Sequence, residues 1–167
     1  MNGSLACRIV ATTVDHASLV ATAEAHTGRL VTQNDEIIGE WVPVAQPSLA
    51  ADDVSKILNA VTRPSENGTE LLVAFSDGDV TETEVAGLYE GAVDMDRRPA
   101  LTLTLTDAGT RMFFRLTADN ADRYLAIIVG GKVRSVPQIL SPINGQFIIV
   151  SPTQAESTKL ATVLKGL

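Results

Sequence analysis

Leucine and threonine alternate over residues 101–105, and this alternation constrains the fold of the 167-residue chain more than any other feature. Leu101, Leu103 and Leu105 alternate with Thr102 and Thr104. Such a pattern is typical of a strand with one buried face and one face in water. A strand of this kind needs a second layer over its apolar side. The pattern therefore predicts a sheet that helices cover on one face.

A short amphipathic helix is predicted directly after this strand, with Thr106 or Asp107 as its N-cap. Its predicted buried stripe comprises Ala108, Met112, Phe113 and Leu116. One ring of the Phe113-Phe114 pair is expected to enter the core. The other ring, Phe114, is then a candidate contact for a partner.

Two turn signals organise the rest of the C-terminal half. Residues 124–129 are predicted to pair with residues 132–136 through Gly130-Gly131, because glycine adopts the positive φ that this turn requires. The sequence Ser151-Pro152-Thr153-Gln154 predicts the start of the last helix, with Ser151 as its cap and Pro152 at its first position. The apolar side of that helix is expected to comprise Leu160, Val163, Leu164 and Leu167.

The N-terminal half is expected to alternate short strands and helices. Strands are predicted at residues 5–12, 37–44, 70–75 and 88–95, and helices at 16–26, at 52–60 and, as a single turn, at 81–85. Asp15 is the predicted N-cap of the first helix. The strand at 37–44 can also be half of a hairpin that is broken at Asn34-Asp35. Residues 64–68, Pro-Ser-Glu-Asn-Gly, form the strongest breaker cluster in the chain.

Helices separated by antiparallel hairpins predict an α+β protein, with a mostly antiparallel sheet and helices on one face. The ferredoxin-like arrangement is the natural candidate for the main unit, residues 66–167. Residues 1–65 are expected to form a small N-terminal α/β appendage, because the breaker cluster is the best candidate boundary.

The composition narrows the classes of partner. The net charge is −7 and the thirteen basic residues are spread along the chain, so we expect no nucleic-acid partner and no direct binding to an anionic membrane. The single cysteine, Cys7, allows no intrachain disulfide and is expected to be a small buried hydrophobe. No segment has the pattern of a signal peptide or the 18–20 apolar residues of a membrane span.

No set of residues predicts catalysis or a metal site. His16 and His26 have no ligand partner at helical spacing, so they are expected to be surface histidines. Asp77-Gly78-Asp79 lacks the ligand schedule of a calcium loop and predicts a turn. Four dispersed carboxylates could form an acid–base pair or a cation site: Glu82, Glu84, Asp94 and Asp96. The simpler interpretation is that they form a solvated face. The sequence therefore predicts a protein that is not an enzyme and has no cofactor.

The last seventy residues carry a more specific signal. The pattern runs from the proline-led strand at 98–105 and the Phe-rich helix end at 112–117 to the hairpin at 125–139. It continues with Ser141-Pro142-Ile143, Gly145-Gln146 and a closing Leu164-Lys165-Gly166-Leu167. In this order, these residues resemble the first periplasmic (P1) domain of SecD, a membrane subunit of the bacterial protein-export machinery. A looser likeness to SecD proteins of planctomycete type extends over residues 5–16 and 41–44.

Some positions depart from the SecD pattern. The usual Asp-Gly turn is Gly130-Gly131, and the usual Ala-Pro is Val136-Pro137. Residues 147–153 replace a segment that in the family contains a glycine and an Asn-Phe pair. The transmembrane helices of SecD, with the carboxylate implicated in proton coupling, have no counterpart in this sequence.

The resemblance implies a non-enzymatic, extracytoplasmic domain on the periplasmic side of the bacterial inner membrane. It implies that the domain binds unfolded preprotein, works with Sec translocon components and assists export driven by the proton-motive force. Membrane association would come only from segments outside this chain. Capture of an unfolded chain suits exposed apolar patches or an open sheet edge, and the candidate surface comprises Phe114, Val133, Val136, Pro137 and Ile139.

Two other functions remain open on the sequence alone. One is a free-standing ferredoxin-like binding or assembly domain with no role in export. The other is a small hydrolase or metal enzyme, whose residues would have to assemble in space from distant positions.

Overall fold

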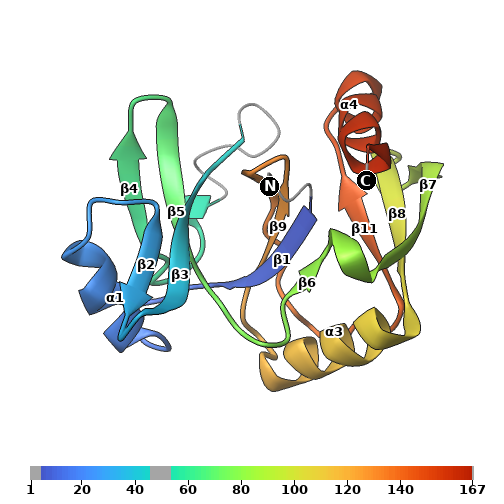
Figure 1. The fold of residues 1–167 in the computed structure, drawn as a ribbon. Helices are drawn as coiled ribbons and strands as arrows, with labels where there is room; N and C mark the ends of the chain where they lie inside the picture. The colour runs from blue at the N-terminus through green and yellow to red at the C-terminus, as the bar shows by residue number, and fades with distance from the viewer. Residues whose placement is uncertain (1–4, 46–53, 167) are drawn as a thin grey trace.

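The computed structural model describes residues 5–45 and 54–166, and it arranges their strands in two antiparallel sheets (Figure 1). The larger sheet has the order β10-β9-β1-β5-β3-β2, with β4 paired to β5 and β6 paired to β1. Its strands are β1 (Leu5–Val10), β2 (Leu30–Gln33), β3 (Glu36–Pro43), β4 (Thr62–Ser65), β5 (Gly68–Ala74), β6 (Val80–Thr81), β9 (Leu125–Val129) and β10 (Lys132–Ser135). The smaller sheet has the order β11-β8-β7, from β7 (Val85–Val93), β8 (Pro99–Leu105) and β11 (Gln146–Val150).

Two helices pack where the sheets approach each other. Figure 1 shows α3 (Asp107–Asp119) running beneath β6 and β8, and α4 (Gln154–Lys165) beside β11 and β8. Phe113 of α3 is fully buried, and its ring lies 5.3 Å from the ring of Phe147 in β11. The inner face of β8, with Leu101 and Leu103 fully buried, belongs to the same core. Burial of each such side chain stabilises the fold by roughly 1.5–3 kcal/mol.

A third helix, α1 (Ala17–Glu24), covers the other end of the larger sheet. Its residues Leu19, Val20 and Ala23 are buried in one cluster with Trp41 of β3 and Leu72 of β5. The core is thus divided into a cluster under α1 and larger clusters around β1 and β9, all held by one continuous sheet.

The hairpins of the sequence pattern are confirmed. Gly130 and Gly131 both have positive φ, 60° and 74°, in the turn between β9 and β10. Asn34 and Asp35, with φ of 51° and 65°, form the turn of the β2–β3 hairpin, so the hairpin alternative for residues 37–44 is correct. The helical turn η1 (Glu82–Glu84) and the strand β7 after it are also confirmed.

Two predicted helix caps are wrong. The N-cap of α1 is His16 and no side chain caps it, because Asp15 instead accepts a hydrogen bond from the Thr12 hydroxyl and pairs with Arg123. The N-cap of α4 is Thr153, whose hydroxyl accepts a hydrogen bond from the backbone N–H of Glu156 at 3.2 Å. The Ser151 that was expected there is buried before the helix begins.

The predicted apolar stripes are correct in part. On α3, Thr106 is the cap, but Ala108 is exposed, and Gly109 and Thr117 complete the buried stripe with Phe113 and Leu116. On α4, Leu160 and Leu164 are buried and Val163 is 40% exposed, while Leu167 lies outside the described residues.

The short helix predicted at 52–60 falls partly outside the described residues. Residues 54–55 are helical, and Val54 and Ile57 are buried. Leu58 is 80% exposed, so the predicted apolar face ends before it.

The α+β class with mainly antiparallel strands is confirmed, and its strands are divided between two sheets. The breaker cluster at 64–68 forms the tight hairpin between β4 and β5. Strand β1 pairs with β5 on one side and with β9 on the other, so residues from both halves of the chain share one sheet. A division into units at residue 65 stays a prediction.

Candidate polypeptide-binding surface

The Phe113-Phe114 pair is divided between core and surface as the sequence predicts. Phe113 is fully buried, whereas Phe114 is 47% exposed on the outer side of α3. Its neighbours on α3, Arg111 and Arg115, are exposed as well. Phe114 is therefore accessible to a partner.

The hairpin at 133–139 presents less apolar surface than the sequence predicts. Val133 is fully buried and Ile139 is 2% exposed. Val44 and Ala45, which are distant in sequence, also cover the outer edge of β10. The N–H of Ala45 donates to the carbonyl of Val133 at 2.9 Å, and Val44 forms a parallel bridge with Val133. Val133 and Ile139 are therefore core residues, and neither can contact a partner in this fold.

Two candidate residues of this hairpin remain at the surface. Val136 is half-buried against the core around β9, and Pro137 is exposed. The carbonyl of Pro137 accepts a hydrogen bond from the N–H of Leu125 at 2.9 Å, which fixes the segment against the end of β9. Of the five predicted residues, Phe114, Val136 and Pro137 can contribute to a surface.

The outer face of the smaller sheet carries apolar side chains that the sequence reasoning missed. The strand register places Ile148 of β11, Thr102 of β8 and Tyr89 of β7 in one row across the sheet. Tyr89 is 64% exposed and Ile148 is 46% exposed. The sequence contained a signal for this exposed face, because residues 99–105 were predicted to have one side in water. The strands that pair with residues 99–105 must expose side chains on the same side.

The turn between β7 and β8 is braced by hydrogen bonds to Asp94 and carries an exposed methionine. Asp94 accepts hydrogen bonds from the N–H groups of Asp96 and Arg98 at 3.0 and 2.7 Å, and its carboxylate pairs with the Arg98 guanidinium. Burial by itself would raise the pKa of Asp94, but these bonds to its charged form hold that pKa below its ordinary value. The tip presents Met95, fully exposed, next to Val93 at 62%.

A network of charges joins the larger sheet internally. Arg8 of β1 donates to Glu40 at 2.6 Å and to Asp79 at 3.2 Å, and Arg29 donates to Glu40 at 2.6 Å. The Arg8 guanidinium also lies 3.8 Å from the centre of the Phe75 ring. Burial raises the pKa of Asp79, although hydrogen bonds from Ser76 and the charge of Arg8 oppose this. Each charge has an opposite partner in the network, as in a structural ion-pair cluster.

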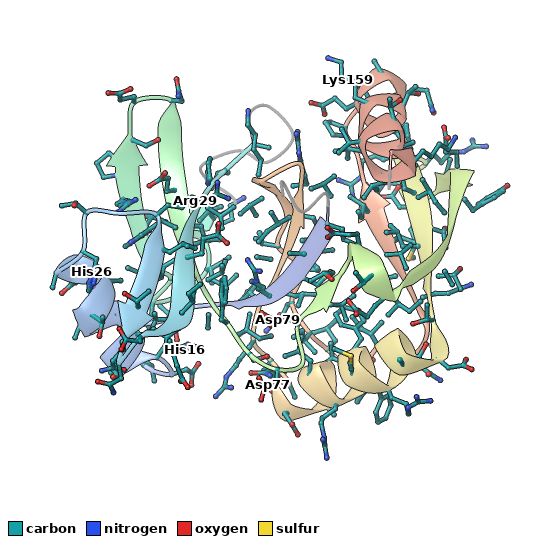
Figure 2. All side chains as sticks on the ribbon, in the orientation of Figure 1. His16, His26, Arg29, Asp77, Asp79 and Lys159 are labelled. Atoms are coloured by element: carbon teal, nitrogen blue, oxygen red, sulfur yellow. The ribbon has the colours of Figure 1, made fainter. Side chains whose placement is uncertain are left out.

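The described part of the chain brings together no metal-binding cluster of side chains. No group of three or more His, Cys, Asp or Glu side chains within residues 5–45 and 54–166 is placed to hold a metal ion. Figure 2 shows His16 and His26 on the α1 side of the molecule, while Asp77 and Asp79 lie in the turn that precedes β6. Cys7 is fully buried, and burial raises the pKa of its thiol, so it is not a ready nucleophile.

Hollows of about 510 and 360 Å³ lie on the surface that the described residues form. The first is lined by Pro43, Val44, Ser65, Glu66, Asn67, Glu70 and Lys132. The second lies among Thr12, Val14, Asp15, Lys56, Leu58, Asn59, Asp122, Arg123, Tyr124 and Gln138. Both are open to solvent. Glu70 in the lining of the first pairs with Arg63, and Asp15 and Arg123 in the lining of the second pair with each other. This geometry suits shallow surface contacts better than enclosure of a small substrate.

Known proteins with similar sequences belong to the SecD and SecDF translocase subunits. The family SecDF, P1 head subdomain, matches residues 55–166. The SecD protein translocase subunit of Acidaminococcus fermentans is 29% identical over 134 residues, which are 79% of this chain and 30% of that protein. The SecDF translocase subunit of Thermus thermophilus is 26% identical over 145 residues, 86% of this chain and 17% of that protein. This chain thus spans less than a third of the length of these relatives.

Solved structures of SecDF share the fold. One, of a SecDF described as a membrane component that enhances protein export, aligns with a TM-score of 0.54 at 21% identity, over 98% of this chain and 63% of that chain. Another, of SecDF in a super-membrane-facing form, aligns with a TM-score of 0.55 at 22% identity, over 98% of this chain and 19% of that chain. Among the described helices of this chain, none has the length and apolar character needed to cross a membrane. Because the family match covers two thirds of its length, the chain belongs to the SecDF P1 head subdomain family.

Proposed function

We propose that this chain is an extracytoplasmic domain of a SecD-like protein-export component and that it binds unfolded preprotein without catalysing a reaction. Membership of the P1 head family supports the export context. The observation that carries the binding role is the set of exposed apolar side chains on strands and a helix, with Tyr89 and Ile148 on one sheet face and Phe114 on α3. Exposed apolar groups on a rigid scaffold suit weak contacts with a chain of variable sequence.

The same proposal names partners and a place in the cell. The domain would work on the periplasmic side of the bacterial inner membrane, next to the Sec translocon. Membrane attachment, and the use of the proton-motive force, would belong to parts of the protein outside this chain. Retention of the emerging preprotein would then prevent its return into the channel.

An equilibrium titration tests the binding role. The purified chain is titrated with a reduced, unfolded preprotein and, in parallel, with the folded, disulfide-bonded form of the same preprotein. We expect weak, micromolar binding of the unfolded form that persists at high salt, because apolar contacts are not screened by ions. Equal affinity for the two forms, or no binding at high micromolar concentration, would contradict the proposal.

A further inference from the structure

We infer that the free edge of β7 receives an extended segment of the bound polypeptide as an additional strand, and that this site favours segments with Lys or Arg beside apolar residues. The inference rests on the proposed function and locates the contact within it. It concerns an edge and a sheet face that lie apart from Phe114, Val136 and Pro137.

Strand β7 is the longest edge strand among those that the structure describes. It has nine residues, compared with four in β2, β4 and β10 and five in β11. Its partner is β8 alone, and Figure 1 shows β7 at the outer margin of the molecule with no element drawn beyond it. By contrast, β10 is covered by Ala45, and β11 faces β10. An uncovered edge offers a row of backbone N–H and C=O groups to an incoming strand.

The irregularities of β7 limit how much chain it can accept. The register with β8 shifts between Val85 and Gly87 and again between Glu90 and Ala92, which leaves a regular run at 87–90. Gly91 has a φ of 98°, and the Tyr89 hydroxyl lies 3.7 Å from the point where a Cβ on Gly91 would be. Bulges of this kind discourage indiscriminate pairing of edges. The expected occupant is therefore a short extended segment of about five residues, and not a long strand.

Side chains on the two faces set the preference for apolar residues. An added strand would continue the outer row of Ile148, Thr102 and Tyr89, so its residue opposite Tyr89 would pack against that ring. On the inner face, Leu88 packs against the core and Glu90 pairs with Lys165 of α4. A segment with apolar side chains toward the outer row would extend the exposed apolar surface that already exists.

The charge around β7 favours a basic segment. Five carboxylates lie in β7 or within three residues of its ends: Glu82, Glu84, Glu90, Asp94 and Asp96. Glu82 and Glu84 directly precede β7, and Asp94 and Asp96 directly follow it. Three cations oppose these five carboxylates: Arg98 and Lys165, through their ion pairs with Asp94 and Glu90, and the exposed Arg97 in the β7–β8 turn. The remaining negative potential would attract Lys or Arg at the ends of an incoming segment.

Short synthetic peptides test this site directly. The probe is a nine-residue peptide of alternating Val and Thr with Lys at both ends, and a matched peptide has Glu at both ends. A third peptide carries N-methyl groups on alternate residues, which remove one row of hydrogen-bond donors. We expect the Lys peptide to bind more tightly than the Glu peptide at low salt, with a difference that shrinks as salt is added. N-methylation of the row that faces β7 should abolish binding.

Amide hydrogen exchange, followed by NMR, locates the bound peptide. Because an added strand occupies outward-facing N–H groups, protection should appear within residues 85–93. The Y89A variant should bind the Lys peptide about two- to fivefold more weakly, the effect of losing one aromatic cross-strand contact. The L140A variant, which truncates a 79% exposed apolar side chain outside the smaller sheet and outside the candidate surface, should bind as the unaltered chain does and serves as the matched control.

The outcomes separate this inference from the proposed function. Three results would overturn strand addition at β7 while leaving polypeptide binding in place. They are protection around Phe114 or Pro137, binding of the N-methylated peptide equal to that of the Lys peptide, and an affinity of the Y89A variant equal to that of the unaltered chain. If the unaltered chain binds neither the peptides nor unfolded preprotein, both the inference and the proposed function fail.

Discussion

Arg8 of β1 and Glu40 of β3 form an ion pair across the end of β5, with 2.6 Å between Nη1 of Arg8 and Oε2 of Glu40. The Arg8 side chain also lies over the Phe75 ring and reaches Asp79 in the turn before β6. This single side chain thus connects three parts of the fold that are distant in sequence. The pair holds the α1 end of the larger sheet to its centre.

Removal of Glu40 should destabilise the fold strongly. The E40A variant leaves the largely buried Arg8 without its main partner, and we expect the free energy of unfolding to fall by about 2–4 kcal/mol. Urea denaturation measures this change. The E36A variant removes an exposed carboxylate from the same strand and should change the free energy by less than about 0.5 kcal/mol. A loss from E40A as small as that of E36A would show that the pair contributes little.

Gly109 should tolerate no side chain. An added Cβ would lie 2.6 Å from Cβ and 2.9 Å from the carbonyl oxygen of Glu84, against which the first turn of α3 packs. The overlap should outweigh the roughly 1 kcal/mol that alanine gains over glycine in a helix, so G109A should lower the free energy of unfolding by about 1–3 kcal/mol.

The matched control for G109A is G87A in β7. No atom lies within 4 Å of a Cβ added at Gly87, and its φ is not positive. We expect G87A to unfold within about 0.5 kcal/mol of the unaltered chain. If G109A proved more stable than the unaltered chain, the close packing of α3 on η1 would be contradicted.

The variants T153A and S151A show which hydroxyl caps the start of α4. T153A removes the hydroxyl that accepts from the N–H of Glu156 and should lower the free energy of unfolding by about 1 kcal/mol. S151A removes a buried hydroxyl that has no hydrogen-bond partner among the described residues, so the fold should be as stable or slightly more stable. Thermal unfolding of the two variants side by side decides between the two candidate N-caps. If S151A were less stable than T153A, Ser151 would be the N-cap after all.

The tip of the β7–β8 hairpin should lose stability in acid through Asp94. The pKa of this carboxyl is lower in the folded chain than in the unfolded chain, so unfolding takes up a proton as the pH falls. The stabilisation is complete above the ordinary pKa of 3.8 and disappears as the pH falls through the lower folded value. Unfolding curves of the chain and of D94N should therefore differ near neutral pH and converge once the pH falls below the lowered folded pKa of Asp94. A constant difference over this range would contradict the assignment.

Local patterns in the sequence predict the strands and turns of this fold well. The alternation at 99–105, the Gly130-Gly131 turn and the Asn34-Asp35 turn each depend on neighbouring residues, and each is found in the structure. The helix caps were less predictable, since Ser151 and Thr153 are chemically similar and differ only in where the chain enters the helix.

The surface could not be predicted in the same way. Apolar periodicity indicates that Val133 is suited to a sheet, but the cover on its edge comes from Ala45, almost ninety residues earlier. The exposure of Tyr89 depends equally on which strand becomes the edge of its sheet. Long-range pairing decides both, and a single sequence does not show it.

Site-specific photo-crosslinking tests the central claim, that an unfolded polypeptide binds the open face of the smaller sheet. A photoreactive residue is placed at position 89, at 148 or, as a control on the exposed side of α4, at Lys159 (Figure 2). Each protein is illuminated with a reduced, unfolded preprotein and with its folded form. We expect adducts from positions 89 and 148 with the unfolded form only. Equal adducts from position 159, or none from positions 89 and 148, would contradict it.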